Sequence, residues 1–311
     1  MTSEQDTVIT PSVTVRAAAK VNLYLGVGRP RPDGYHPLAT VYQTLSLHDD
    51  VTVRTSPEWA VDLICEDDID RSAFPAGEEN IVVRAGRLLV AHHGVEQAAV
   101  LTVRKSIPIA GGLAGGSADA AAALVALDRL WDLQTSDEDL LMLAGSLGSD
   151  VPFALVGGTA LGGGRGELVT PVQDEATRWW VVVPARVGLS TPAVYRHFDE
   201  LRSDAPEEVS VPDELIAALA EPDSRALAAA LGNDLEHAAV DLRPELGELL
   251  EAGERAGALR GLISGSGPTC VFLCTDRGSA DRVRAALVDD GHPRVLVALG
   301  PVTGTHVVEY S

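Results

Sequence analysis

Apolar and polar positions along this 311-residue chain follow two periods, one typical of strands and one typical of helices. Alternating or β-branched runs predict strands at the following residues: 13–17, 21–27, two runs within 38–55 that break at 48–50, and 98–104. Apolar residues three and four positions apart predict helices at 80–90, 116–132 and 137–147. Asn80 is the expected cap of the first of these helices, and Thr135-Ser136 that of the third.

The second half of the chain continues this mixture. It predicts further elements in this order: a strand at 179–183, a helical region at 212–257, a strand–loop–strand at 262–273, a helix at 278–289 and strands near 294–298 and 305–309. Glycine pairs and triplets between 157 and 166 predict a flexible connection, so we place a boundary near residue 170. The expected architecture is α+β with two domains, 1–170 and 171–311, preceded by a disordered lead-in over 1–12.

The most informative stretch runs from Lys105 to Leu130. A strand leads to a proline, then to four glycines within six positions, and then to an alanine-rich helix. Glycines let a backbone approach a ligand closely, and a helix N-terminus offers unpaired N–H groups and a positive dipole end. This order predicts an anion site, most often one for phosphate. It is not a Walker A loop, because Ser117 stands where that motif needs lysine. A glycine-rich turn without a ligand is the alternative.

Composition excludes several classes of function. The formal net charge of −21 argues against a nucleic-acid surface, and it means that local donors would hold any anionic substrate. No apolar run approaches the length of a membrane span, and the polar, acidic start is unlike a signal peptide. Cys65, Cys270 and Cys274 are too few for a zinc site or a disulfide framework, so we expect them to be reduced. The prediction is a cytoplasmic protein.

Lysine usage singles out two positions. Only two of the 24 basic residues are lysines, Lys20 and Lys105, and the others are arginines. A retained lysine suggests a site that needs a compact ammonium, which a guanidinium cannot imitate. Lys105 precedes the glycine loop, and it is expected either to reach a nucleotide or to be a surface lysine. Asp150, between a helix end and an apolar segment, is by itself either a solvated turn residue or a functional carboxylate.

Several separated stretches together resemble the GHMP kinase superfamily. Its three motifs match Lys20-Val21-Asn22-Leu23, the glycine loop, and residues 264–269 (Ser-Gly-Ser-Gly-Pro-Thr). Three more stretches are similar to the subfamily that phosphorylates the 2-hydroxyl of a cytidine-diphosphate-linked methylerythritol in the non-mevalonate route to isoprenoid precursors: 31–36, Glu79-Asn80 and 148–153. The match runs in order through nearly the whole chain. It departs at Ala110, Ala114 and Ala118, which slightly stiffen the loop.

The resemblance implies an N-terminal ATP-binding domain like ribosomal protein S5 domain 2 and a ferredoxin-like C-terminal domain, with the active site in the cleft between them. It implies that Asp150 is the general base, which a poorly nucleophilic tertiary alcohol requires. Lys20 is its implied partner, because a nearby ammonium keeps a carboxylate ionised and stabilises developing charge.

The resemblance also implies the ligands and their contacts. ATP with Mg²⁺ would be held by the loop region: Lys105, Pro108, Ile109, Ala110, Gly111, Gly112, Leu113, Ala114, Gly115, Gly116 and Ser117. Ser117 is also a weak candidate for metal contact, through Mg·ATP. Asn80 would either contact the adenine side or simply cap its helix. The cytidine substrate would meet Asn22, Tyr35, His36, Tyr195, Gly265 and Thr269, with the two tyrosines on the faces of cytosine and His36 at its edge.

Other functions remain open at this point. One is another GHMP kinase, of the homoserine, mevalonate or galactose type, and another is a non-catalytic relative that senses ATP and a small molecule. Residues 33–36 and the run around Asp150 argue against the first, and the presence of both Lys20 and Asp150 argues against the second. The expected partner is a small molecule, with no nucleic acid and no membrane. Oligomeric state and Mg²⁺ coordination do not follow from the sequence.

Overall fold

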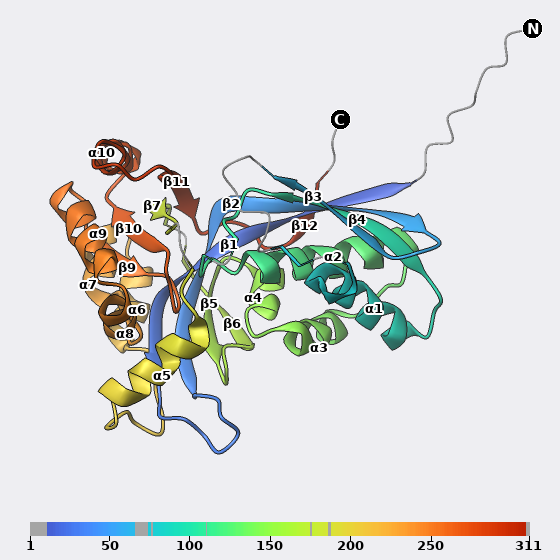
Figure 1. Cartoon of the computed structure of the whole chain (residues 1–311), viewed down its shortest axis with the longest axis horizontal. Coiled ribbons are helices and arrows are strands. Elements are labelled where there is room, and N and C mark those ends of the chain that lie inside the picture. Colours follow the sequence, from blue (N-terminus) through green and yellow to red (C-terminus); the bar gives the residue numbers. More distant parts are fainter. Residues whose placement is uncertain are drawn as a thin grey trace, which may run out of the picture.

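The structure is a computed structural model that describes residues 11–65, 74–75, 77–109, 111–174, 176–185 and 188–308. Within these residues the larger sheet has eight strands (Figure 1). Five of them follow one another across the sheet: β12 (His306–Val307), β1 (Ser12–Val27), β2 (Leu38–Ser56), β4 (Ala98–Lys105) and β3 (Ala60–Cys65). The remaining three extend it at the sides: β5 (Thr159–Gly163) on β2, β6 (Leu168–Val172) on β5, and β8 (Gly232–Asn233) on β1.

Helices cover one face of this sheet, below the strands in Figure 1. They are α1 (Ile81–His93), α2 (Gly115–Trp131), α3 (Asp137–Leu147) and α4 (Val151–Val156), and a short 3-10 turn, η2 (Gly77–Glu79), precedes α1. The predicted helices are confirmed to within a few residues, because their apolar positions are buried: α1 and α2 pack on the sheet, and α3 packs on α1, α2 and α4. Both predicted caps are confirmed: the Asn80 side chain accepts from Val82 N–H, and that of Ser136 accepts from Asp139 N–H.

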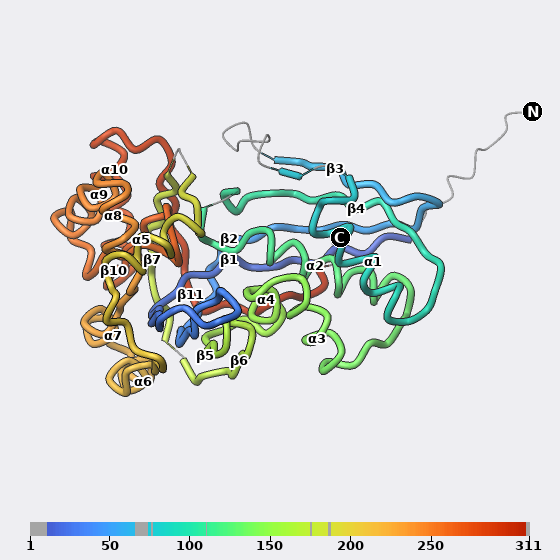
Figure 2. The backbone as a smooth tube through the Cα atoms, turned by 60° about the horizontal axis from the view of Figure 1, so that its bottom comes forward, coloured from blue at the N-terminus to red at the C-terminus, as the bar shows by residue number. Residues whose placement is uncertain are grey.

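The second half builds a smaller antiparallel sheet. Its four strands within the described residues lie in the order β11 (Leu296–Gly300), β7 (Arg178–Val183), β10 (Cys270–Cys274) and β9 (Arg260–Ile263), which is a ferredoxin-like arrangement. The helices of this half gather beside that sheet in Figure 2: α5 (Thr191–Leu201), α6 (Asp213–Leu219), α7 (Ser224–Ala230), α8 (Glu236–Leu242), α9 (Pro244–Arg255) and α10 (Arg277–Asp289). The two-domain α+β prediction is thereby confirmed. Cys270 and Cys274 are free and buried in β10, as expected.

The two halves are not separate along the chain. Both β8 and β12 belong to the second half, yet they pair with β1 of the large sheet. The predicted boundary at residue 170 falls inside β6, and it stays a prediction.

Two strand predictions were wrong in the same way. The runs at 13–17 and 21–27 are one strand, β1, and the two runs within 38–55 are one strand, β2. Residues 48–50 do not break the strand, because they pair in register with residues 16–18 of β1. A bulge lies directly before them: Ala18 pairs with His48 and Ala19 with Leu45, so β2 carries two extra residues at 46 and 47. A bulge absorbs extra residues while the ladder continues on both sides. Polar residues inside a strand therefore did not mark its end.

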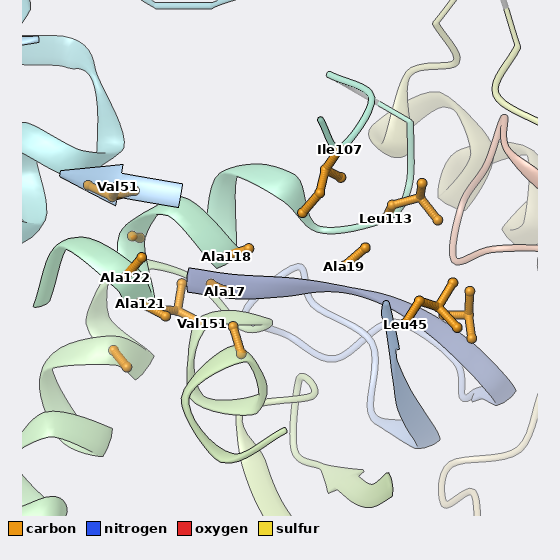
Figure 3. Close-up of a cluster of buried hydrophobic side chains, with 14 of the residues drawn as sticks. Ala17, Ala19, Leu45, Val51, Ile107, Leu113, Ala118, Ala121, Ala122 and Val151 are labelled. Atoms are coloured by element: carbon orange, nitrogen blue, oxygen red, sulfur yellow. The ribbon is translucent and has the colours of Figure 1, made fainter. Parts of the chain in front are cut away.

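Small side chains bring α2 close to β1. Figure 3 shows Ala118, Ala121 and Ala122 of α2 facing Ala17 and Ala19 of β1. All five are fully buried, and a methyl group is the largest side chain at each contact. Because protein interiors are close-packed, such an interface lets the helix lie directly against the strand. The glycine loop before α2 is thus held next to the segment of β1 that carries Lys20.

Across the described part of the chain, no helix has the length and apolarity needed to cross a bilayer.

Candidate active site

A cavity of about 740 Å³ is lined by both halves of the chain. It brings together most of the residues predicted from the sequence: Lys20, Asn22, Tyr35, His36, Gly111, Gly112, Ala114, Gly115, Gly116, Ser117, Asp150, Tyr195 and Gly265. These residues come from β1, the turn after it, the glycine loop, the start of α4, α5 and the loop between β9 and β10. Segments distant in sequence therefore converge on one site of a size suited to a small molecule.

Lys20 and Asn22 lie on the same side of β1 because they are two residues apart. The Lys20 Nζ donates to Asn22 Oδ1 at 2.7 Å, and Asn22 Nδ2 donates to Thr40 Oγ1 at 2.8 Å. Register shifts at Ala18/Ala19 and at Asn22/Tyr24 bracket these two residues. Bulges redirect side chains locally, and here they flank the polar pair that faces the cavity.

Asp150 occupies the N-cap position of α4, but its side chain makes no capping hydrogen bond. Its Oδ2 lies 3.7 Å from Lys20 Nζ, and its side chain is 31% exposed at the cavity. On the other side, the Tyr42 hydroxyl donates to Oδ1 at 3.2 Å. One carboxylate oxygen thus faces an ammonium and the other accepts from a phenol, in a position open to a ligand.

The glycine loop is held from two sides. The Lys20 N–H donates to Leu113 O at 3.1 Å, and the Ser264 Oγ donates to Gly112 O at 3.0 Å. Gly112 has a φ of +77°, and a Cβ there would lie 2.6 Å from Ser264 O, so only glycine fits. Ala114, the N-cap of α2, is also in the left-handed region, at φ 55°. As at any helix start, the N–H groups of the first turn have no intrahelical partners.

Lys105 is buried rather than at the surface, so the surface alternative was wrong. Its Nζ lies 2.5 Å from Asp49 Oδ2 and 2.8 Å from Asp119 Oδ2. Asp49 Oδ1 also accepts from the N–H groups of Ser106 (2.7 Å) and Ile107 (2.9 Å). We call Asp49, Lys105 and Asp119 the buried triad. It ties β2 and β4 to the residues that enter the glycine loop and to the N-terminal part of α2.

Charge in the buried triad is unbalanced, with two carboxyl groups for one ammonium. Burial, opposed by Lys105 and reinforced by the Asp49 charge, raises the pKa of Asp119 to about 8. Both carboxyl groups raise the pKa of Lys105 against the effect of its burial, which keeps its ammonium charged. Asp119 Oδ1 is buried and has no hydrogen-bond partner, which also disfavours the ionised carboxylate.

Other predicted contact residues lie outside the cavity lining. Leu113 and Thr269 are fully buried, and the Thr269 hydroxyl lies 3.0 Å from where a Cβ of Gly111 would be. Asn80 is buried and bonded to its helix N-terminus and to Pro75 O, so the capping alternative describes its contacts. Pro108 and Ile109 precede the loop without lining the cavity. Ala110 lies outside the described residues.

Aromatic rings also line the cavity. The rings of His36 and Tyr195 are 4.9 Å apart, and Tyr35 is about half exposed. His36 Nε2 is 2.9 Å from Asp199 Oδ1, and the Arg165 guanidinium lies 5.0 Å from the Tyr35 ring centre. Burial, with the negative charge of Asp150, raises the pKa of the Tyr195 hydroxyl, which therefore stays protonated.

Four functional candidates escaped the sequence analysis: Tyr42, Arg165, Arg196 and Asp199, all of which line the cavity. Arg165 lies in a segment that the glycines marked only as flexible, and Tyr42 lies in a strand of otherwise ordinary alternation. Single side chains outside a motif have no characteristic spacing by which the sequence could identify them. Among the described residues, no group of three or more His, Cys, Asp or Glu side chains is placed to hold a metal ion.

Comparison with known proteins identifies the family. The family model for the GHMP kinases N terminal domain matches residues 80–158, and that for the GHMP kinases C terminal matches 215–292. A curated relative from Nocardioides sp., named 4-diphosphocytidyl-2-C-methyl-D-erythritol kinase, is 64% identical over 96% of this chain and 100% of its own. A protein of the same name from Mycolicibacterium smegmatis is 50% identical over 97% of this chain and 94% of its own.

Solved structures of related kinases have the same fold. A crystal structure of 4-(cytidine 5'-diphospho)-2C-methyl-D-erythritol kinase superposes with a TM-score of 0.75 at 32% identity, covering 93% of this chain and 99% of that one. A homoserine kinase from Cytophaga hutchinsonii, at 22% identity and a TM-score of 0.73 over 98% of this chain and 100% of that one, shares the fold. With both family models matched and close relatives along its full length, the chain is a kinase that belongs to the GHMP kinase family, alongside the curated 4-diphosphocytidyl-2-C-methyl-D-erythritol kinases.

Proposed function

We propose that this protein transfers the γ-phosphoryl group of ATP to the 2-hydroxyl of 4-diphosphocytidyl-2-C-methyl-D-erythritol. The observation that carries the proposal is the Lys20–Asp150 pair, 3.7 Å apart in a cavity that also contains the glycine loop. The names of relatives at 64% and 52% identity supply the substrate. The product serves isoprenoid precursor synthesis by the non-mevalonate route, and we expect the protein to work in the cytoplasm.

In this reaction Asp150 accepts the proton of the 2-hydroxyl as its oxygen bonds to the γ-phosphorus. The bond from that phosphorus to the β,γ-bridging oxygen breaks, and ADP leaves with the electron pair. Lys20 offsets negative charge on the attacking oxygen and the phosphoryl group. Because Nζ of Lys20 is anchored by Asn22, the ammonium is already in place before substrate binds. Phosphoryl transfer depends mainly on such positioning and charge neutralisation.

The glycine loop and the start of α2 fit the phosphates of ATP. The unpartnered N–H groups of the first helical turn and the Ser117 hydroxyl are donors beside the cavity, and Gly116 leaves open space above them. Bound Mg²⁺ would neutralise phosphate charge. With no acidic metal cluster among the described residues, Ser117 is the loop side chain that would contact it, and phosphate oxygens would supply the other ligands.

The aromatic residues that line the cavity fit a nucleobase. Tyr35 and Tyr195 would stack on cytosine, and His36, oriented by Asp199, would hydrogen-bond the edge of the base. Asn22 and Gly265, which also line the cavity, would contact the substrate near its reacting end. Thr269 would act indirectly, by supporting the glycine loop from behind.

The deciding experiment measures ADP release with Mg·ATP and 4-diphosphocytidyl-2-C-methyl-D-erythritol, beside homoserine, mevalonate and galactose. We expect turnover with the cytidine substrate alone and a loss of about 10³-fold or more in kcat for Asp150→Asn. Asn keeps the size of the side chain and removes only its charge, so ATP binding should persist. Turnover with homoserine, mevalonate or galactose alone would overturn the proposed substrate. ATP binding without any turnover would favour a sensor in place of a kinase.

A further inference from the structure

Tyr42 contacts both members of the Lys20–Asp150 pair. It lies across from Asn22 in the β1–β2 ladder, which places it diagonally from Lys20 on the same face. Its hydroxyl donates to Asp150 Oδ1 at 3.2 Å, and the Lys20 Nζ lies 5.5 Å from its ring centre. A backbone acceptor, Gly166 O, is farther from the hydroxyl at 3.4 Å. The carboxylate is therefore its stronger partner.

The surroundings of Tyr42 hold its ring in one place. Phe153 of α4 stacks on the ring with centres 4.8 Å apart, and Tyr42 itself is 2% exposed. A Cβ at Gly162 would lie 2.5 Å from the ring, and a Cβ at Gly166 would overlap the hydroxyl at 2.3 Å. The glycines of the β5–β6 hairpin thus make room for this phenol. A ring that is buried and stacked in this way can hold its hydrogen-bonded partner in a fixed position.

Charges near Asp150 come from every element around it. Lys20 faces it from β1, Tyr195 from α5, and Arg165 and Glu167 lie in the β5–β6 hairpin. Burial, together with the Asp150 charge, raises the pKa of Tyr42 well above its usual value. Tyr42 therefore stays a neutral donor across the working pH range and is excluded as a base. Its hydroxyl proton is therefore available to Oδ1 of Asp150.

We propose that Tyr42 is a positioning residue for the phosphoryl transfer: its donation to Oδ1 of Asp150 leaves Oδ2, the oxygen beside Lys20, to receive the substrate proton. The inference deepens the proposed function and rests on it. A carboxylate bound at one oxygen has its second oxygen aimed and unshared, which a general base needs within hydrogen-bond reach of the reacting hydroxyl. Small displacements of such a group reduce the rate even when substrate still binds.

The test is Tyr42→Phe, which removes one oxygen and keeps the packed ring. We expect kcat to fall about tenfold while KM for both substrates changes less than about twofold. Tyr24→Phe is the matched control, a phenol of β1 that does not line the cavity, and it should leave both quantities unchanged.

A second readout separates this inference from the proposed function. In protein with ¹³C-labelled aspartate carboxyl groups, the Asp150 signal is assigned by its absence in Asp150→Asn, and its chemical shift is compared between the parent and Tyr42→Phe without substrate. A changed chemical shift supports the contact even if the cytidine substrate is not turned over. An active Tyr42→Phe enzyme with unchanged kcat and an unchanged Asp150 chemical shift would overturn the inference.

Discussion

The two lysines of this chain lie in two sites of similar chemistry and opposite accessibility. Lys20 faces one carboxylate at 3.7 Å, and that carboxylate is 31% exposed in the cavity. Lys105 contacts two carboxyl groups at 2.5 and 2.8 Å, and all three side chains are at most 3% exposed. The buried triad therefore has no room for a ligand. The Lys20–Asp150 pair is looser, incompletely satisfied and open.

This difference indicates that the buried triad supports the structure and that the Lys20–Asp150 pair is available for chemistry. In the buried triad, direct contacts fix the backbone on both sides of the glycine loop, through Ser106 and Ile107 before it and through Asp119 after it. In the cavity, the spacing between Lys20 and Asp150 leaves both groups free to act on a third molecule. A charged group whose partners are complete supports structure, and one with remaining hydrogen-bonding capacity can support chemistry.

Lys105→Met should have the largest effect and should act on stability. It leaves two carboxyl groups buried without their cation, a change that typically costs about 3–5 kcal/mol. We expect the thermal midpoint to fall by about 10 °C in calorimetry. Adding Asp119→Asn should recover little of the loss near neutral pH, because Asp119 already carries a proton there and the uncompensated charge is that of Asp49. A Lys105→Met protein as stable as the parent would contradict a structural role for the triad.

Lys20→Met should act on catalysis in place of stability. Removing the ammonium beside Asp150 should lower kcat by about 10²-fold, equivalent to about 2.7 kcal/mol of transition-state stabilisation. Because Asp150 remains partly solvated, the thermal midpoint should change by only a few degrees. Steady-state kinetics beside a melting curve checks both expectations. A variant that melts as early as Lys105→Met would show that the two lysines do not differ in the way proposed.

Asp119→Asn should have the smallest effect, a change in how the melting temperature depends on pH. The folded-state pKa of Asp119 is raised to about 8, above the value of an unfolded aspartate, so the folded state retains a proton that the unfolded state releases. This contribution to stability is complete at about pH 4 and is lost as pH rises to about 8. The melting temperature of Asp119→Asn relative to the parent should therefore rise between pH 5 and 8. A constant difference would contradict the raised pKa.

Part of the candidate site could be predicted from the sequence. The glycine loop, Lys20, Asn22, Asp150, Tyr35 and His36 each belong to a contiguous motif with its own spacing, and the structure brings all of them to one cavity. Helices with periodic apolar faces and side-chain caps were predicted closely, because their signals are local. Strand continuity was mistaken at residues 48–50, because a buried ion pair compensates the polar residue Asp49 from 56 positions away.

The sequence by itself determined the order of elements and the two-domain α+β class, and it predicted a phosphate-binding loop and a candidate base with its lysine. Only the tertiary structure decided what Lys105 contacts, that Tyr42 reaches Asp150, and that strands from the end of the chain complete the first sheet. The physical reason is range. Periodicity, capping and glycine geometry act within a few residues, whereas burial and charge pairing depend on which distant segments become neighbours.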